Sequence, residues 1–272
     1  MTTPPASVIV LSFNTCALTL QCLSTFGPDL LDRGWQVILV DNASSDATVE
    51  IVSEHFSYVD VIRSERNLGF AGGNNLGLRR ATGDCVFLIN SDVIATADTL
   101  QALAHTLQSQ TQVGAMSPGL ITPGGVPQAF AFGSDPTPGY LIRRGLGTLL
   151  RREPMHRWDI EQPIDADWVS GACLCIRKAT LEQVGLLDER FKLYFEDSDW
   201  CMRMRQAGWR VVYDPRFKVI HLGGASLPQR RDANQLYYRS MIQFYAKHYG
   251  TLSTTLLRLL LLPYTALMAR RR

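Results

Sequence analysis

Four short apolar runs, each followed by a helix-like stretch, constrain the fold of this chain more than any other feature. The runs are continuous rather than alternating, which is typical of strands buried on both faces of a parallel sheet. They occupy residues 7–13, 36–40, 58–62 and 85–89. Helical patterns follow at residues 15–31, where Gly27-Pro28 is the expected end, and then at about 46–55 and 96–108, while the turn at 67–77 runs into a helix that ends near Thr82-Gly83. This alternation predicts an α/β domain with right-handed crossovers.

Polar residues stand where these predicted strands end. Asn14 follows the first run, Asp41 the second, and Asn90-Ser91-Asp92 the fourth. In open parallel sheets, ligands bind beyond the carboxyl ends of the strands. Two acids meeting at this edge therefore predict a ligand site. A lone acid after a strand is more often a helix cap, and we expect that role for Asp46.

The usual nucleotide-binding signatures are absent from the sequence. No G-x-G-x-x-G follows the first strand and no G-x-x-x-x-G-K-[ST] is present, which excludes an ordinary dinucleotide dehydrogenase and a P-loop NTPase. Residues 67–77 instead form an Asn- and Gly-rich stretch running into a helix. It is either a flexible loop or a close backbone contact with a ligand. Asn and Gly offer hydrogen bonds without bulk, which favours the contact.

An acidic cluster lies at the start of a later helix. Glu196, Asp197 and Asp199 fall within four residues, and the helical pattern continues to Gly208. Acids at this end complement the helix dipole, so they could be capping residues only. The apolar flank at 191–195 favours a second interpretation, in which a walled cleft desolvates one carboxylate and makes it a better base.

The stretches around the acidic cluster leave alternatives open. Residues 123–167 are rich in Pro and Gly and predict a long loop or flap. Within it, 140–144 and 149–152 pair apolar with basic residues, which fits a solvated loop or contact with a lipid-linked or phosphorylated acceptor. A strand is expected at 168–177, a helix at 180–184, and short strands at 211–213 and 217–220. His221 then is either structural or a metal or phosphate contact.

The charge is unevenly distributed along the chain. The segment 229–272 holds eight Lys/Arg and one Asp, a net +7, so a chain of net +2 leaves −5 on the rest. This asymmetry predicts a metal or cationic cofactor in the body and an anionic surface at the tail, and the body has no basic stripe for nucleic acid. The apolar stretch 252–268 contains Arg258 and Pro263. It suits a helix lying on a membrane, or one packing on the body or on a second subunit of a homo-oligomer.

The cysteines and the N-terminus indicate a compartment. The six cysteines form no C-x-x-C pair, so we expect buried free thiols in a reducing environment. Residues 1–5 show no basic and apolar signal pattern, which predicts a cytoplasmic body.

Taken together, the motifs resemble the family 2 glycosyltransferases of GT-A fold, specifically their bacterial rhamnosyltransferase-like branch. The resemblance covers about residues 6–249. It rests on the order and spacing of VDNASSDAT at 40–48, NLGFAGGNNLG at 67–77, NSD at 90–92, SGACLCIRK at 170–178 and YFEDSDWCMR at 194–203.

The resemblance implies a GT-A catalytic domain at 1–228, with a mostly parallel central sheet flanked by helices, and a C-terminal helical tail at 229–272. It also implies roles for particular residues. Asp197 would be the catalytic base with Glu196 beside it, and Asp92 with His221 would hold a divalent ion, Mg²⁺ or Mn²⁺. Asn90 replaces the first Asp of the family's D-x-D motif, which removes a charge. The donor would contact Asn14, Asp41, Asn67, Gly72, Asn75, Asn90 and Ser91, and the acceptor would contact Trp168, Ser170, Gly171, Asp199 and Trp200.

The implied function is transfer of a sugar with inversion, since one base without an opposing nucleophile implies direct displacement. The branch points to rhamnose from a dTDP-sugar, with a UDP-sugar second. The expected acceptor is a hydroxyl of a glycan or lipid-linked molecule in cell-wall or surface polysaccharide synthesis, with the enzyme peripheral on the inner face of the plasma membrane. A non-catalytic nucleotide-sugar or glycan-binding protein is the alternative. A nucleotidyltransferase would need a Gly- and Arg-rich loop after the first strand, and residues 13–18 have none.

Overall fold

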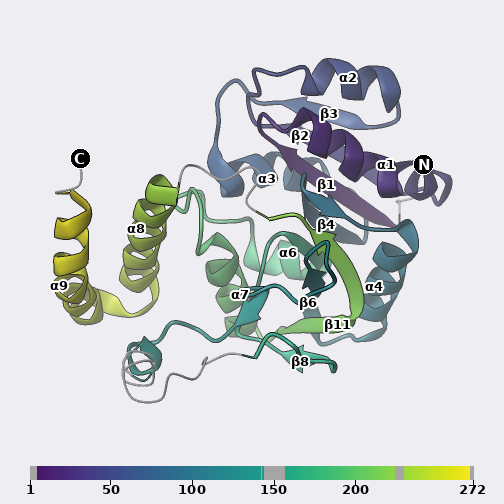
Figure 1. The fold of residues 1–272 in the computed structure, drawn as a ribbon. Helices are drawn as coiled ribbons and strands as arrows, with labels where there is room; N and C mark the ends of the chain where they lie inside the picture. The colour runs from purple at the N-terminus through teal and green to yellow at the C-terminus, as the bar shows by residue number, and fades with distance from the viewer. Residues whose placement is uncertain (1–4, 142, 144–156, 224–229, 270–272) are drawn as a thin grey trace.

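The computed structural model describes residues 5–141, 143, 157–223 and 230–269, and the fold is shown in Figure 1. Its centre is a mixed sheet in which the strands lie in the order β3-β2-β1-β4-β10-β6-β11-β5, with β8 added beside β11. The bounds are β1 Ala6–Ser12, β2 Gln36–Asp41, β3 Asp60–Arg63, β4 Cys85–Asn90, β5 Val93–Ile94, β6 Val113–Ile121, β8 Ile164–Asp165, β10 Cys173–Arg177 and β11 Arg210–His221. A separate small pair joins β7 (Phe132–Gly133) to β9 (Trp168–Val169).

The first four long strands are parallel, as the sequence predicts. The β1 strand pairs in parallel with β2 and with β4, and β2 pairs in parallel with β3. The β10 strand runs antiparallel to β4 and β6, while β11 runs parallel to β6. The register sets Ser12 opposite Asp41 and Leu11 opposite Asn90. The polar residues at the strand ends therefore reach one edge of the sheet.

Helices flank this sheet (Figure 1). The α1 helix packs beside α4 and against β2, while α3 packs on β1 and β2 and α7 packs on β9 and β11. Their bounds are α1 Cys16–Asp32, α2 Thr48–His55, α3 Gly69–Arg80, α4 Ala97–Ser109, α6 Lys178–Val184, α7 Glu196–Gln206, α8 Arg230–His248 and α9 Gly250–Ala269. The N-cap position of α2 is Ala47 and not Asp46, but Asp46 lies one residue earlier and its Oδ1 accepts a hydrogen bond from the Thr48 N–H at 3.2 Å.

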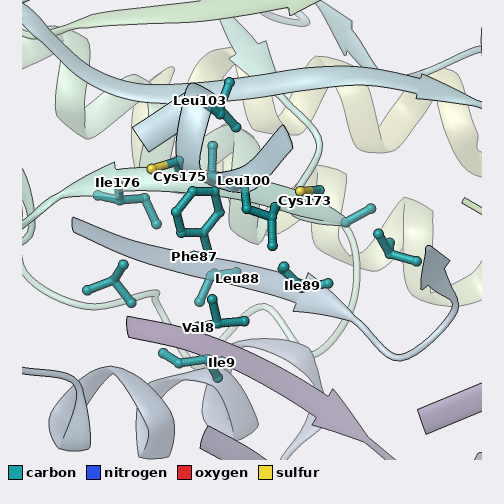
Figure 2. Close-up of a cluster of buried hydrophobic side chains, with 14 of the residues drawn as sticks. Val8, Ile9, Phe87, Leu88, Ile89, Leu100, Leu103, Cys173, Cys175 and Ile176 are labelled. Atoms are coloured by element: carbon teal, nitrogen blue, oxygen red, sulfur yellow. The ribbon is translucent and has the colours of Figure 1, made fainter. Parts of the chain in front are cut away.

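The main core lies where the sheet meets α4. Figure 2 shows Phe87 and Leu88 of β4 among Val8 of β1, Leu100 of α4 and Cys175 of β10. Each of these residues is at most 1% exposed, which explains why these strands are continuous apolar runs. The six cysteines are free, and all but Cys16 are buried. Burial raises the pKa of Cys173 and of Cys201 to about 12, so both stay protonated thiols.

The structure differs from the sequence analysis in three places. The α1 helix continues through Gly27-Pro28 to Asp32, because the buried side chains of Phe26 and Leu30 hold its last turn on the core despite the missing proline N–H. The expected strands at 211–213 and 217–220 are one strand, β11, with a register shift between Asp214 and Lys218. The sequence analysis also missed β6, which lies between β10 and β11. The apolar and basic pairs at 140–144 and 149–152 fall largely outside the described residues.

The C-terminal helices pack beside the acidic cluster. A second hydrophobic cluster joins Phe191 and Phe195 to Phe244 and Tyr245 of α8 and Leu257 of α9. Phe244 and Tyr245 are therefore buried. Among the described residues, no helix is both long and apolar enough to cross a bilayer.

Candidate active site

The acidic cluster opens α7 after a strained turn. Tyr194 and Phe195 adopt left-handed backbone angles, with φ of 65° and 68°, and α7 begins at Glu196. Non-glycine residues in this region carry strain that persists only where the surroundings enforce it, and such strain clusters at functional sites. Here Ser240 of α8 donates a hydrogen bond to the Leu193 carbonyl at 2.8 Å. The turn is thus fixed from the C-terminal helix, and the prediction of an acidic helix start is confirmed.

Asp197 is held by backbone donors and borders a cavity. Its Oδ1 accepts from the Ser198 N–H at 2.7 Å, and its Oδ2 accepts from the Gly171 N–H at 3.3 Å. Asp197 remains partly exposed, whereas Glu196 and Ser198 on either side of it are buried. A carboxylate oriented by two N–H groups and open on one side can accept a proton from a bound hydroxyl.

Glu196 is the buried partner of this carboxylate. Only 5% of the residue is exposed, and its Oε2 has no hydrogen-bond partner among the described residues. Burial, and then the charge of Asp197, raise the pKa of Glu196 well above its usual range. Burial also raises the pKa of Asp197, against the opposing effect of the Ser198 and Gly171 N–H groups. When the pair carries a single negative charge, the N–H groups that contact Asp197 favour its location there.

A cavity of about 560 Å³ opens in front of Asp197. Its walls are largely aromatic, and they come from the loop before β8, the start of β9, the turn before α7, and α8. The rings include those of Phe130, Trp158, Trp168, Tyr194, Tyr237 and Tyr238. Ser170 also lines the cavity, beside Asp197. An apolar hollow with a few converging polar groups is the usual form of a small-molecule site.

The end of β4 is tied to the same region. The Asn90 N–H donates to the Ala172 carbonyl at 2.9 Å, next to the Gly171 N–H that holds Asp197. Ser91 is 3% exposed, and its hydroxyl lies 3.0 Å from that of Thr15. This bond uses the Ser91 side chain to join the first and fourth strand ends.

Asp92 and His221 lie side by side at this edge. The Asp92 side chain is 2% exposed, and its Oδ1 lies 3.3 Å from His221 Nε2. The two atoms are not aligned for a hydrogen bond, and Oδ1 has no hydrogen-bond partner among the described residues. A buried carboxylate oxygen without a partner, beside an imidazole nitrogen, fits a divalent cation. No cluster of three or more His, Cys, Asp or Glu occurs in the described parts of the chain, so phosphates and water would have to complete the coordination.

Among the residues expected to contact a donor, Asp41 keeps a carboxylate oxygen that the described residues do not use. It is 2% exposed, its Oδ2 accepts from the Ser44 N–H at 3.2 Å, and its Oδ1 has no partner in the described structure. Asn14 instead organises the neighbouring loop, because its Oδ1 accepts from the Ser45 N–H at 2.7 Å.

The Asn-rich stretch is occupied mainly with its own anchoring. Asn75 donates to the Leu187 carbonyl and accepts from the Leu187 N–H, at 2.9 and 3.0 Å. Asn67 Oδ1 accepts from Asn42 and from the Gly69 N–H. Gly72 leaves no room for a side chain, since a Cβ there would lie 2.8 Å from that of Leu68. These amides hold α3 to the body rather than facing a ligand.

Two residues expected at the acceptor lie in the interior instead. Asp199 and Trp200 are fully buried, and neither lines the cavity. Trp200 donates its indole N–H to the Gly185 carbonyl at 2.8 Å, and Asp199 pairs with Arg203 at 2.9 Å. Their acceptor role is wrong because both side chains are buried and bound to partners inside the protein. Trp168 and Ser170 do line the cavity.

Several residues at the site were not identified from the sequence. Tyr237 and Tyr238 of α8 line the cavity, and Lys247 and His248 contact Asp199. Gln128 contacts His221. The aromatic content of α8 was visible in the sequence, but no local pattern distinguishes a ring in a cavity from a ring on a membrane surface.

Comparisons with known proteins agree with this geometry. Residues 7–127 match the family described as Glycosyl transferase family 2. N-acetylglucosaminyl-diphospho-decaprenol L-rhamnosyltransferase of Mycobacterium tuberculosis is 30% identical over 212 residues, which cover 70% of this chain and 67% of that protein. Rhamnosyltransferase WbbL of Escherichia coli is 24% identical, with 70% and 74% covered.

Solved structures share the fold. The mannosyltransferase PcManGT from Pyrobaculum calidifontis, in complex with GDP-Man and Mn²⁺, superposes with a TM-score of 0.61 at 20% identity, covering 95% of this chain and 69% of that one. GalNAc-T7 with UDP, GalNAc and Mn²⁺ superposes with a TM-score of 0.59 at 17% identity, covering 94% and 54%.

Proposed function

Because the chain belongs to glycosyl transferase family 2 and has the GT-A fold, we propose that it is an inverting, metal-dependent rhamnosyltransferase acting in surface glycan synthesis. The observation that carries this proposal is the position of Asp197. It borders the aromatic cavity, and through Gly171 and Ala172 it is joined to the strand end that bears Asp92. This arrangement supports a base next to a candidate diphosphate site.

Asp197 would act on the acceptor. It takes the proton from the acceptor hydroxyl while that oxygen forms a bond to the anomeric carbon of the donor, and the bond from that carbon to the diphosphate oxygen breaks. The nucleoside diphosphate leaves with the electron pair. Among the described residues, the only carboxylate besides Asp197 that lines the cavity is the buried Glu196, which we do not assign as a nucleophile, so the proposed displacement is direct and inverts the configuration. Burial raises the pKa of Asp197 and so strengthens it as a base.

Asp92 and His221 would hold the divalent ion. The buried Oδ1 of Asp92, which has no hydrogen-bond partner among the described residues, and the adjacent Nε2 of His221 offer one oxygen and one nitrogen ligand. When bound, Mg²⁺ or Mn²⁺ neutralises charge on the leaving diphosphate. The neutral Asn90 leaves Asp92 as the carboxylate of this strand end, so we expect a weak site that tightens with the donor phosphates.

Asp41 would contact the nucleobase at the end of β2. We propose a dTDP-sugar, with rhamnose as the sugar, and a UDP-sugar as the second choice. The names of the two rhamnosyltransferase relatives support rhamnose. The acceptor would enter the aromatic cavity, where Trp168, Ser170 and Gly171 lie beside the base. The decaprenol-linked substrate in the name of the mycobacterial relative supports a lipid-linked acceptor.

We place the catalytic unit at about residues 1–249, since α8 lines the cavity and Ser240 holds the turn before α7. The expected boundary at 228 would cut through this arrangement. Only α9 then remains as a peripheral segment. It exposes Leu252 and Leu260 by 76% and 74%, together with Leu256, Leu259 and Leu262. This apolar surface in a segment of net positive charge supports contact with the inner face of the plasma membrane.

Thermal shifts with a panel of nucleotide sugars test the donor. A donor that binds the folded state raises the melting temperature by mass action. We expect a dTDP-sugar to give the largest shift in Mn²⁺ and a smaller one in excess chelator. A shift with uridine donors and none with thymidine donors would reject thymine as the nucleobase of the donor. Binding without transfer or hydrolysis of any donor would favour a non-catalytic binding protein.

A further inference from the structure

We propose that Gln128 is a positioning residue that fixes the ring of His221 in the tautomer carrying its proton on Nδ1, so that Nε2 presents a lone pair beside Asp92 for a divalent cation. The metal part rests on the proposed function. The tautomer itself rests only on contacts between residues of this chain.

The fold brings Gln128 to His221 from 93 residues away. The β6 and β11 strands run in parallel and end together, with Ile121 opposite Ile220. After β6 the chain turns back, and the Gln128 N–H donates to the Leu120 carbonyl at 2.9 Å. The Gln128 side chain is therefore anchored at its backbone directly beside the last residue of β11.

The amide of Gln128 makes two contacts with the same histidine. Its Nε2 donates to the His221 backbone carbonyl at 2.6 Å, and its Oε1 lies 2.8 Å from His221 Nδ1. A backbone carbonyl can only accept hydrogen bonds, so the amide nitrogen must face it. Rotating the amide by half a turn would set two acceptor oxygens against each other. The orientation of Gln128 is thus determined by the carbonyl.

The orientation of the amide determines the tautomer. Oε1 can only accept, so His221 Nδ1 must carry the hydrogen that it donates. In the neutral ring, Nε2 then has a lone pair and no hydrogen. This nitrogen lies 3.3 Å from Asp92 Oδ1, and that oxygen accepts no hydrogen bond from it. Two electron-rich atoms side by side in a buried place form a favourable arrangement once a cation lies between them.

The alternative tautomer would close the site. With the hydrogen on Nε2, His221 could rotate slightly and donate to Asp92, and the pair would satisfy itself without a cation. Partners that orient a ligating histidine through its second nitrogen fix the tautomer, and their loss typically weakens metal affinity by about 10- to 100-fold. Gln128 supplies such a partner for His221.

Two variants and one control test the proposal. Gln128→Met keeps the length of the side chain and removes both hydrogen bonds. Gln128→Glu keeps an acceptor for Nδ1–H and should retain the tautomer. Val126→Ala alters an exposed residue of the same turn and leaves the amide in place. Circular dichroism and thermal melting check that each variant is folded.

The first measurement is the ring nitrogen spectrum of His221 in ¹⁵N-labelled protein without metal, assigned by its loss in His221→Asn. We expect Nδ1–H in the wild type, in Val126→Ala and in Gln128→Glu, and a shift toward Nε2–H in Gln128→Met. A wild-type ring with its hydrogen on Nε2, or an unchanged ring in Gln128→Met, would overturn the proposal.

The second measurement is Mn²⁺ binding, followed by water proton relaxation with the metal alone. We expect the dissociation constant to rise by about 10- to 100-fold in Gln128→Met and to stay unchanged in Val126→Ala. Equal affinity in Gln128→Met and wild type would overturn the positioning role. No Mn²⁺ binding by a wild type with the expected tautomer would instead overturn the metal site of the proposed function while supporting the Gln128–His221 arrangement.

Discussion

Lys247 at the end of α8 places its Nζ 2.6 Å from Oδ1 of Asp199, a fully buried carboxylate two residues after Asp197. His248 Nε2 lies 2.7 Å from the same oxygen, and Arg203 Nε lies 2.9 Å from Oδ2. Burial alone would raise the pKa of Asp199, but hydrogen bonds from His248 and Lys247 hold it below its usual range. The C-terminal helix is therefore fastened to the helix that carries the proposed base.

Replacing Asp199 tests the strength of this attachment. Asp199→Asn removes the buried charge that Arg203 and Lys247 share and that His248 also contacts, and we expect the free energy of unfolding to fall by about 3–5 kcal/mol. Urea denaturation at neutral pH measures it. The matched control is Asp98→Asn, which removes an exposed partner of Arg33 and should cost less than about 1 kcal/mol. Equal losses in the two variants would contradict a structural role for Asp199.

Replacing Asp197 tests the proposed base. Asp197→Asn keeps the shape of the side chain and removes its basicity, so we expect turnover to fall by about a hundredfold or more. Donor affinity, measured by thermal shift, should change little because the donor contacts lie at the strand ends. Turnover close to wild type would move the base to another residue, with Glu196 as the first candidate.

Glu196 gives a prediction about pH. Its pKa in the folded protein is raised by burial and by the charge of Asp197, above an unfolded value of about 4.3. Below that value both states hold the proton, so Glu196→Gln should have little effect on stability. As pH rises, the unfolded chain releases its proton while the folded chain retains it, and the wild type loses stability.

We therefore expect Glu196→Gln to raise the melting temperature at neutral pH by an amount that shrinks toward pH 4.5. Asp199→Asn should instead lower the melting temperature, and by more at neutral pH than near pH 4. The lowered pKa of Asp199 stabilises the fold at pH values above its unfolded pKa of about 3.9. A pH-independent effect of Glu196→Gln would contradict this prediction, because it would mean that folding leaves the pKa of Glu196 unchanged.

Ending the chain at Gly250 tests the proposed membrane contact. The α8 helix and its contacts with Asp199 remain, although the packing of Leu257 on the second hydrophobic cluster is lost. We expect the truncated protein to stay folded and to bind anionic liposomes more weakly in a sedimentation assay, with lower activity on a lipid-linked acceptor. Equal liposome binding by both proteins, with a change from dimer to monomer in ultracentrifugation, would show instead that α9 packs on a second subunit.

The sequence by itself determined the sheet of the first half and the start of α7. Strands buried on both faces need continuous apolar runs, so β1, β2 and β4 could be predicted from local composition. Because parallel strands end at one edge, Asp41 and Asp92 could be placed there without coordinates. The β6 strand escaped prediction because Gly114, Pro118 and Gly119 interrupt its apolar pattern, and it is buried only because β10 and β11 enclose it.

Tertiary structure decided which polar residues serve the site. Asn75 and Asp199 belong to motifs that indicated ligand contact, yet each is used to hold one part of the chain to another. Gln128 and Lys247 belong to no motif, and they reach the site from distant segments. Helical and strand periods are set by neighbouring residues. A hydrogen bond across 93 positions depends on how whole elements pack. The residues near Gln128 in the sequence therefore do not indicate that it contacts His221.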